Sequence, residues 1–399
     1  MKKLRKVYER LVEGTLFLCG NITGIAILLI VFFLFREGVG FFGRNSVEEG
    51  YTLALNKKNP VVKLSSREIK DIFDGEITTW DEVGGLEEEI VLFRFNDITN
   101  YVDDEELGEE FEHVPACITK IIHENPSMIA FFPKAYLEEN FSEKILQVDN
   151  IGFLEFFAGD EWMPTAHPSA QFGILSLIMG TLWVSLGAIL IALPLGLGVA
   201  IYLSEVAKKR FRNFLKPVIE LLAGIPSVVY GFFGLVVLVP FIQKTFNLPI
   251  GETGLSGSII LAIMALPTII TIAEDAMRTT PLAMKEASLA LGATRWQTTY
   301  KVVIPYASSG ITAAAILGIG RAIGETMAVL MVTGNAAIIP HTFLEPLRTI
   351  PATIAAELGE APKSSTHYQA LFLLGVILFV ITLIVNVSVE FVNKRKRYE

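Results

Sequence analysis

Two charged residues, Arg321 and Glu325, stand inside a long apolar stretch of the chain, residues 308–334. A charge at bilayer depth costs several kcal/mol unless it is paired or hydrated, and such charges usually mark a substrate path. A guanidinium fork suits tetrahedral oxyanions, because its planar donors contact two oxygens together. Four positions apart, the two residues would share one face of a continuous helix, so Glu325 could hold the arginine when no anion is bound. The alternative is a purely structural ion pair between helices.

Small residues recur around these charges. They are spaced as Ala314-x-x-x-Gly318 and Gly320-x-x-x-Gly324. This spacing permits close helix approach in membranes. The glycines also leave room beside the charged face, which favours a substrate path over the structural pair.

A second segment, residues 279–305, is typical of a helical hairpin rather than a membrane span. Pro281 is favoured as the first residue of a helix, and Gly292 is well placed to end that helix. Small residues, Ala287 and Ala290, would then be exposed on a compact surface that fits a partner's groove. The alternative is a short linker hairpin with no partner.

Several chemistries find no support in the sequence. No GxxxxGK[ST] phosphate loop occurs, and the five histidines are scattered without metal-ligand spacing. The two cysteines, Cys19 and Cys117, give no disulfide framework. We therefore expect no ATP hydrolysis by the chain itself, and no enzyme activity, cofactor, metal or nucleic-acid partner.

The elements that must position these residues are membrane helices. Apolar residues make up 52% of the 399 residues, and the mean hydropathy is +0.50. Spanning a bilayer takes roughly 20 mostly apolar residues. Six blocks qualify, and they predict an all-α integral membrane protein: 15–35, 172–204, 216–242, 254–276, 308–334 and 369–392.

Charge divides the chain into an acidic insert and a basic membrane body. Residues 37–168 carry 28 acidic and 10 basic residues, a net charge of −18, whereas the remainder has a net charge of +9. We interpret 37–168 as an extracytoplasmic α/β domain between the first two spans. The other expected parts are 1–36 (tail and first helix), 169–393 (membrane core with five helices) and 394–399 (basic tail).

The short basic segments predict the orientation. They are the N-terminal tail, the segments after the second and fourth spans, and the C-terminal tail. With six spans all four fall on one side, so the positive-inside rule places both termini in the cytoplasm. The insert and the 335–368 loop would then lie outside.

The hairpin segment resembles a known coupling element. Glu286-Ala287-Ser288, then Gly292, then Ile304-Pro305 resemble the EAA loop of ABC-importer permeases. In that family this loop docks in a cleft of the ATPase subunit. The core from about 172 to 392 resembles the six-helix type I importer permease fold.

Within that group the chain is similar to PstC-type phosphate permeases. The residues that carry the resemblance are Phe172–Ile174, Leu221–Tyr230, Glu274–Ala276, Gly318–Val329 and Arg348–Glu357. The resemblance implies an inner-membrane, multi-pass permease subunit for binding-protein-dependent phosphate transport. Arg321 and Glu325 would belong to the substrate pathway, and Glu286, Ala287 and Gly292 to the ATPase-coupling loop.

The resemblance also implies partners: a second permease subunit in a heterodimer, two copies of an ABC ATPase, an extracytoplasmic phosphate-binding protein, and membrane lipid. Alternatives from the residues alone are a permease for another oxyanion such as molybdate or sulfate, a phosphate sensor and a secondary transporter. The coupling-loop motif argues against the last.

The insert departs from the family pattern, in which this connection is short. Residues 55–85 and 123–130 are similar to parts of a periplasmic phosphate-binding protein, with Ser65 expected to cap a helix and Trp80 to anchor the core. After Arg94 the expected Ser-Gly-Thr anion loop is replaced by Asp97-Ile98-Thr99. We therefore expect the insert not to bind phosphate. It is either a docking or gating domain for the true receptor or a fused remnant.

Overall fold

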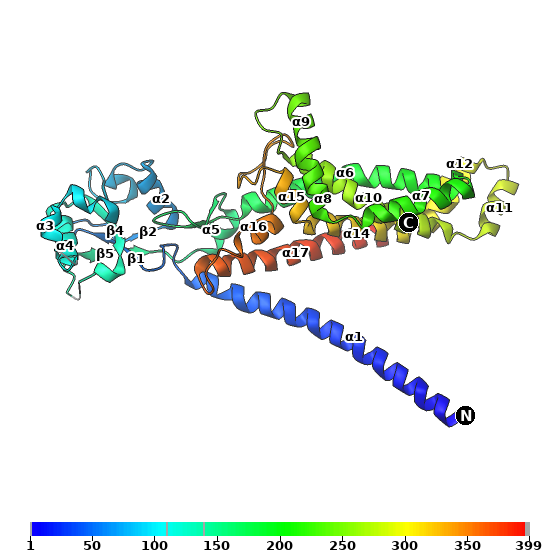
Figure 1. The fold of residues 1–399 in the computed structure, drawn as a ribbon, viewed down its shortest axis with the longest axis horizontal. Coiled ribbons are helices and arrows are strands. Elements are labelled where there is room, and N and C mark those ends of the chain that lie inside the picture. Colours follow the sequence, from blue (N-terminus) through cyan, green and yellow to red (C-terminus); the bar gives the residue numbers. More distant parts are fainter. Residues whose placement is uncertain (1, 109–110, 139, 396–399) are drawn as a thin grey trace. The chain divides into compact units, whose positions relative to one another are not determined.

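The computed structural model of the chain describes residues 2–108, 111–138 and 140–395. It divides into two compact units, each described here by itself (Figure 1). The membrane unit comprises Met1–Gly38, Leu175–Ala361 and Leu371–Glu399. The insert unit comprises Val39–Ile174 and Pro362–Ala370.

Five helical segments in the described residues are long and apolar enough to cross a membrane, and a bent helix pair raises the number to six. This agrees with the predicted all-α membrane fold. The five are α1 (Lys2–Val39), α6 (Leu175–Ile201) with the π-helical turn Tyr202–Val206, α8 to α9 (Ser227–Phe246), α10 (Gly254–Arg278) and α17 (Thr366–Arg395).

Helix α10 is the centre of the membrane unit, where α6 and α14 (Ser308–Gly324) pack against it. Both neighbours approach α10 through a glycine. A Cβ added at Gly196 of α6 or Gly318 of α14 would meet the side chain of Ile269 at 2.7 or 2.8 Å. Small residues therefore fix the spacing of these helices, as expected for packing in lipid.

The predicted third span, 216–242, begins too early. Gly224, Ile225 and Pro226 separate α7 (Lys209–Ala223) from α8 (Ser227–Phe233), and the apolar span starts only at Ser227. Proline has no N–H to continue a helix, and the residue before it avoids helical geometry. Helix α7 is consequently an element of its own, and α9 (Val239–Phe246) follows α8 through a π-helical turn.

The predicted fifth span, 308–334, is two helices rather than one. Helix α14 ends at Gly324, and α15 (Met327–Val332) starts after two non-helical residues. On the N-terminal side of α14, the helical stretch Arg295–Tyr306 makes an angle of 71° with α14. After α15, the chain forms the short helix α16 (Ile350–Glu357) before entering α17.

The insert unit is built on a four-stranded mixed sheet of order β3-β4-β1-β5. Strand β1 pairs antiparallel with β4 and β5, whereas β3 pairs parallel with β4. Successive side chains of a strand point to opposite faces. Leu53 and Leu55 of β1 thus join the core that contains Trp80, and Ala54 joins the core beneath α4.

The elements of the insert unit, including the four strands of this sheet, are short. They are β1 (Tyr51–Leu55), β2 (Lys63–Leu64), α2 (Ser66–Asp74), β3 (Val91–Arg94), α3 (Asp104–Leu107), α4 (Val114–Glu124), β4 (Met128–Pro133), β5 (Lys144–Ile145), β6 (Gln147–Val148), α5 (Phe153–Ala158), β7 (Trp162–Met163) and β8 (Gln171–Phe172), with four 3-10 turns at Gly40–Gly43, Trp80–Val83, Phe95–Asn100 and Lys134–Tyr136. Strand β2 pairs with β6, and β7 with β8.

Local sequence signals in the insert are confirmed. The Ser65 side chain accepts a hydrogen bond from the Glu68 N–H at the start of α2, and Gly75 ends this helix with a positive φ of 80°. Trp80 is buried, and its Nε1 donates to the Ser127 carbonyl at 2.8 Å. The expected limits 37–168 remain a prediction, and of the expected tail 394–399 only residues 394–395 lie within the described residues.

Candidate anion pathway and coupling loop

Arg321 lies in the last turn of α14 and is half-buried. Within the part of the chain that the structure describes, no carboxylate forms an ion pair with its guanidinium. Arg321 lies three residues before the end of α14 at Gly324. A cation with no ion-pair partner among the described residues therefore stands beside the break between α14 and α15.

Glu325 does not share a helical face with Arg321, so this expectation is wrong. Because α14 ends at Gly324, Glu325 has extended backbone angles, φ −72° and ψ 131°. Its Oε1 instead accepts from the Ala328 N–H at 3.5 Å in the first turn of α15. A carboxylate at this position is favoured by the exposed N–H groups of a helix start.

The glycine face beside Arg321 is open. Around Gly320 and Gly324 no atom would lie within 4 Å of an added Cβ, so within the described chain these glycines do not pack against another helix. The expected close approach holds at Gly318, which contacts α10, but not at the other pair. The open face leaves space next to the guanidinium.

A cavity of about 490 Å³ adjoins the break between α14 and α15. One wall is formed by Gly324 and Thr326, and Leu378 of α17 contributes to the lining. The other wall is one face of α16, made by residues at positions 351, 354, 355 and 358. Its walls are mostly apolar, it is wide open on one side, and Arg321 is not among its lining residues.

An ion pair that the sequence did not reveal fixes α16. Arg348 precedes this helix and Glu357 ends it, and Arg348 Nη2 lies 2.7 Å from Glu357 Oε1. Both side chains are largely buried. Thr349 caps the helix, and Thr181 of α6 accepts from the Ile350 N–H at 3.0 Å. The pair lies nine residues apart, which no helical spacing rule would connect.

A second unforeseen cluster joins α7 to α10. Glu274 is only 1% exposed, and Lys216 Nζ lies 2.6 Å from its Oε2 and 2.6 Å from Asp275 Oδ1. Arg278 is a further neighbour of Glu274, at 3.6 Å. A buried carboxylate needs such compensation, because burial of an unpaired charge is strongly unfavourable. The sequence contained these acids as motif residues but gave no signal for their basic partner.

The candidate coupling segment, residues 279–305, forms the predicted hairpin. Helix α11 (Leu282–Ala290) is followed by Gly292 with a φ of +83°, and then by α12 (Arg295–Thr298). Glu286 and Ala287 are exposed, and Leu291 at the tip is 90% exposed. One detail differs from the expectation: Pro281 caps α11 from outside rather than being its first residue.

An ion pair connects this hairpin to the end of α6. Lys285 Nζ of α11 lies 2.7 Å from Oε1 of Glu205 in the π-helical turn, and both side chains are largely buried. The two residues also line a cavity of about 420 Å³ together with Glu286 and Trp296. A displacement of the hairpin would therefore reach α6 directly.

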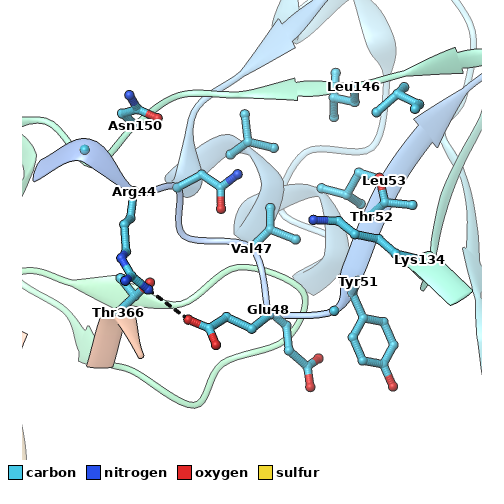
Figure 2. Close-up of a pocket in the computed structure, with 16 residues that line it drawn as sticks. Arg44, Val47, Glu48, Tyr51, Thr52, Leu53, Lys134, Leu146, Asn150 and Thr366 are labelled. Atoms are coloured by element: carbon cyan, nitrogen blue, oxygen red, sulfur yellow. Dashed lines mark hydrogen bonds and ion pairs between the residues drawn. The ribbon is translucent and has the colours of Figure 1, made fainter. Parts of the chain in front are cut away.

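The insert unit contains a polar pocket of about 550 Å³ (Figure 2). Arg44 and Lys134 line it together with Glu48 and Glu49, and Arg44 Nη1 lies 3.1 Å from Glu49 Oε1. The mixture of charges gives no preference for an anion. The guanidinium of Arg94, elsewhere in the unit, is engaged internally: it donates to the Phe73 carbonyl at 2.9 Å and lies over the Phe73 ring.

Glu143 is a buried carboxylate of the insert unit with a structural role. It accepts from the Lys57 N–H and contacts His123 Nδ1, each at 2.8 Å. Burial by itself raises its pKa, but these contacts outweigh that effect and hold the pKa below its usual value. Within residues 2–108, 111–138 and 140–395 no group of three or more His, Cys, Asp or Glu is placed to hold a metal ion.

Comparison with known proteins identifies relatives of the chain. Probable ABC transporter permease protein YqgH of Bacillus subtilis is 39% identical over 250 residues, 63% of this chain and 81% of that protein. Phosphate transport system permease protein PstC of Mesorhizobium japonicum is 42% identical over 257 residues, 60% of this chain and 77% of that protein. A solved inward-facing MetNI methionine ABC transporter gives a TM-score of 0.42 at 20% identity, covering 56% of this chain and 94% of that chain.

A family match covers about half of the chain. Residues 192–398 match the family described as binding-protein-dependent transport system inner membrane component. Together with its membrane helices, this match establishes a multi-pass membrane protein. The chain belongs to the family of binding-protein-dependent transport system inner membrane components and, within it, to the PstC-type permeases.

Proposed function

We propose that the chain is the permease subunit of an ATP-driven phosphate importer and forms the phosphate translocation pathway. The observation that carries this proposal is Arg321, a half-buried cation in an apolar span with no carboxylate partner among the described residues. A permanent positive charge beside an open glycine face attracts an anion, and a guanidinium contacts two oxygens of a tetrahedral oxyanion at once. The name of the PstC relative points to phosphate as that oxyanion.

In this proposal the two pathway residues have different tasks. Arg321 contacts the passing phosphate directly and holds it weakly. Glu325 keeps the start of α15 in place through its contact with the Ala328 N–H. Because its carboxylate is not bonded to Arg321, the guanidinium stays available to the anion. The break after Gly324 leaves backbone groups near the pathway, where water in a cavity can satisfy them.

The proposed assembly contains a second permease, an ABC ATPase dimer and an external phosphate-binding protein. The surface at Gly320 suits contact with a helix of a second permease, since no described residue of another helix lies within 4 Å of a Cβ added there. The exposed hairpin with Glu286, Ala287 and Gly292 suits a groove of the ATPase. ATP hydrolysis then belongs to the partner, and the chain itself transports.

The proposed cycle is alternating access. Closure of the ATPase dimer draws the coupling hairpins together, the spans open outward, and phosphate released by the docked receptor reaches Arg321. Hydrolysis resets the pathway. The basic segments support an orientation in the inner membrane with both termini in the cytoplasm and residues 37–168 outside, where this insert would help the receptor dock.

Anion competition tests the substrate. In proteoliposomes that contain this chain with its partner subunits and receptor, excess unlabelled phosphate should suppress uptake of labelled phosphate, whereas sulfate and molybdate should leave it nearly unchanged. Two ATPase-deficient controls, one without ATP and one with a non-hydrolysable analogue, should give no uptake. ATP-driven uptake of sulfate or molybdate that ignores phosphate would replace the proposal by its alternative.

The contact between Lys285 and Glu205 predicts a coupling defect. Lys285→Met removes the ion pair at 2.7 Å while keeping a side chain of similar length. Loss of one partner of a largely buried pair is expected to lower receptor-stimulated ATP hydrolysis several-fold, because the hairpin would no longer be held to α6. Glu205→Gln should give a similar loss, and the exposed Lys209→Met, at the start of α7, should give none. Wild-type stimulation in both pair variants would exclude this link.

A further inference from the structure

An exposed aromatic surface on the insert unit has no role in the proposed transport cycle. It consists of Phe42, Phe153, Leu154 and Phe157, here called the α5 patch. Phe153 and Leu154 are 65% and 79% exposed, and the other two are half-buried. Large apolar side chains gathered on one surface usually mark an interaction site.

The α5 patch is held rigidly outward by ring packing. The Phe42 ring lies 5.7 Å from that of Phe153 and 5.6 Å from that of Phe156, and the Phe153 and Phe157 rings are 4.4 Å apart. Phe156 and Phe41 beneath them are fully buried, with their rings 5.0 Å apart. The inner rings are thus covered, whereas Phe153 and Leu154 remain exposed among the described residues.

Chain connectivity places this patch at the level of the membrane surface. Phe42 lies three residues beyond Val39, the end of α1, and inside the apolar stretch Val12–Gly43 that is long enough to span a bilayer. Each residue extends the chain by at most about 3.6 Å. On the other side, the Ile174 N–H donates to the Phe156 carbonyl of α5 at 3.0 Å, and the second span begins at the next residue, Leu175.

We propose that the α5 patch is an interfacial anchor that inserts into the headgroup–acyl boundary of the outer leaflet. Aromatic side chains are favoured at this depth, and short amphipathic elements bind there by burying apolar area. The exposed apolar residues Phe35 and Val39 of α1 lead along the chain into Phe42 of the patch.

Charged residues beside the α5 patch bear on which lipids it can bind. A cavity of about 340 Å³ beside Leu154 is lined by Arg67 but also by three acidic residues, Glu155, Asp160 and Glu161. With three carboxylates against one guanidinium, the rim is net negative and offers no attraction to an anionic headgroup. Insertion is accordingly driven by apolar burial, and zwitterionic bilayers are expected to bind the patch at least as well as anionic ones.

Spin labelling of the full chain tests the anchor independently of transport. Leu154→Cys and, separately, Phe153→Cys are labelled in a background in which Cys19 and Cys117 are replaced by Ser and Ala. The chain is reconstituted in phosphatidylcholine vesicles, with and without phosphatidylglycerol. Power saturation compares collisions of the label with oxygen, which concentrates in lipid, and with a water-soluble nickel chelate.

The matched control is Tyr101→Cys. Tyr101 is 42% exposed and lies three residues before α3, which stands at the opposite end of the insert unit from α5 (Figure 1). The ratio of oxygen to nickel collisions should be several-fold higher at positions 153 and 154 than at 101, in both kinds of vesicle. A ratio equal to that of the control would overturn the proposal, as would labels shielded from both agents, because a protein would then cover the patch.

Discussion

Arg321→Gln is expected to reduce phosphate uptake about a hundredfold, because one or two charge-assisted hydrogen bonds are worth about 3 kcal/mol to the anion. Transport of labelled phosphate into proteoliposomes measures this. Assembly with the partner subunits should be unchanged, since the guanidinium has no ion pair in the described residues whose loss would destabilise the fold. Phosphate uptake by Arg321→Lys should lie between that of the wild type and that of Arg321→Gln, because lysine retains the charge but loses the planar fork.

A matched control and a second variant make this result interpretable. Arg210→Gln changes an exposed arginine at the start of α7 and should leave uptake at the wild-type rate. Glu325→Gln should reduce uptake much less than Arg321→Gln, because Glu325 bonds to the α15 backbone rather than to the arginine. If the two residues formed only a structural pair, the single variants would be equally impaired and the double variant would recover. That pattern, or full uptake by Arg321→Gln, would refute the pathway role.

Gly292→Leu is expected to uncouple the ATPase. At a φ of +83° a residue with a Cβ costs about 1–2 kcal/mol, and the leucine also adds bulk to an exposed tip. The affinity of the hairpin for the ATPase should therefore fall about tenfold or more. Co-purification with the ATPase and receptor-stimulated hydrolysis measure this effect.

Two further variants at position 292 distinguish the effect of backbone conformation from the effect of side-chain bulk. Gly292→Ala adds strain with little bulk, whereas Gly292→Asn adds bulk at a residue type that tolerates positive φ. If backbone shape limits docking, Ala should be the more impaired, and if space in the partner's groove limits it, Asn should be. Normal coupling in all three variants, Leu included, would contradict a docking role for the loop.

The sequence alone determined much of the membrane architecture. Block length and composition predicted the apolar spans, because burial of the backbone in lipid requires about 20 apolar residues whatever their neighbours are. The helix ends at Ser65 and Gly292 also followed from sequence, since a cap or a positive φ is decided within a few residues. The proposed coupling hairpin was predictable for the same reason, because its helix ends are decided by neighbouring residues.

The helix breaks were less predictable. Composition could not distinguish the continuous span expected at 308–334 from α14 and α15 separated after Gly324, because glycine permits both arrangements. The break before α8 has a clearer local cause, because Pro226 cannot continue the hydrogen bonding of α7. Helix continuity after Gly324 is decided by tertiary neighbours that satisfy, or fail to satisfy, the freed backbone groups.

Only the tertiary structure decided how charges are paired. Glu325 was expected beside Arg321 and bonds the backbone of α15 instead, while Glu205 meets Lys285 and Glu274 meets Lys216 from far along the chain. A carboxylate in a sequence gives no distance to the cations of other helices. Partner choice depends on where the helices cross, and the crossing is set by packing at glycines such as Gly196 and Gly318 rather than by the charged residues themselves.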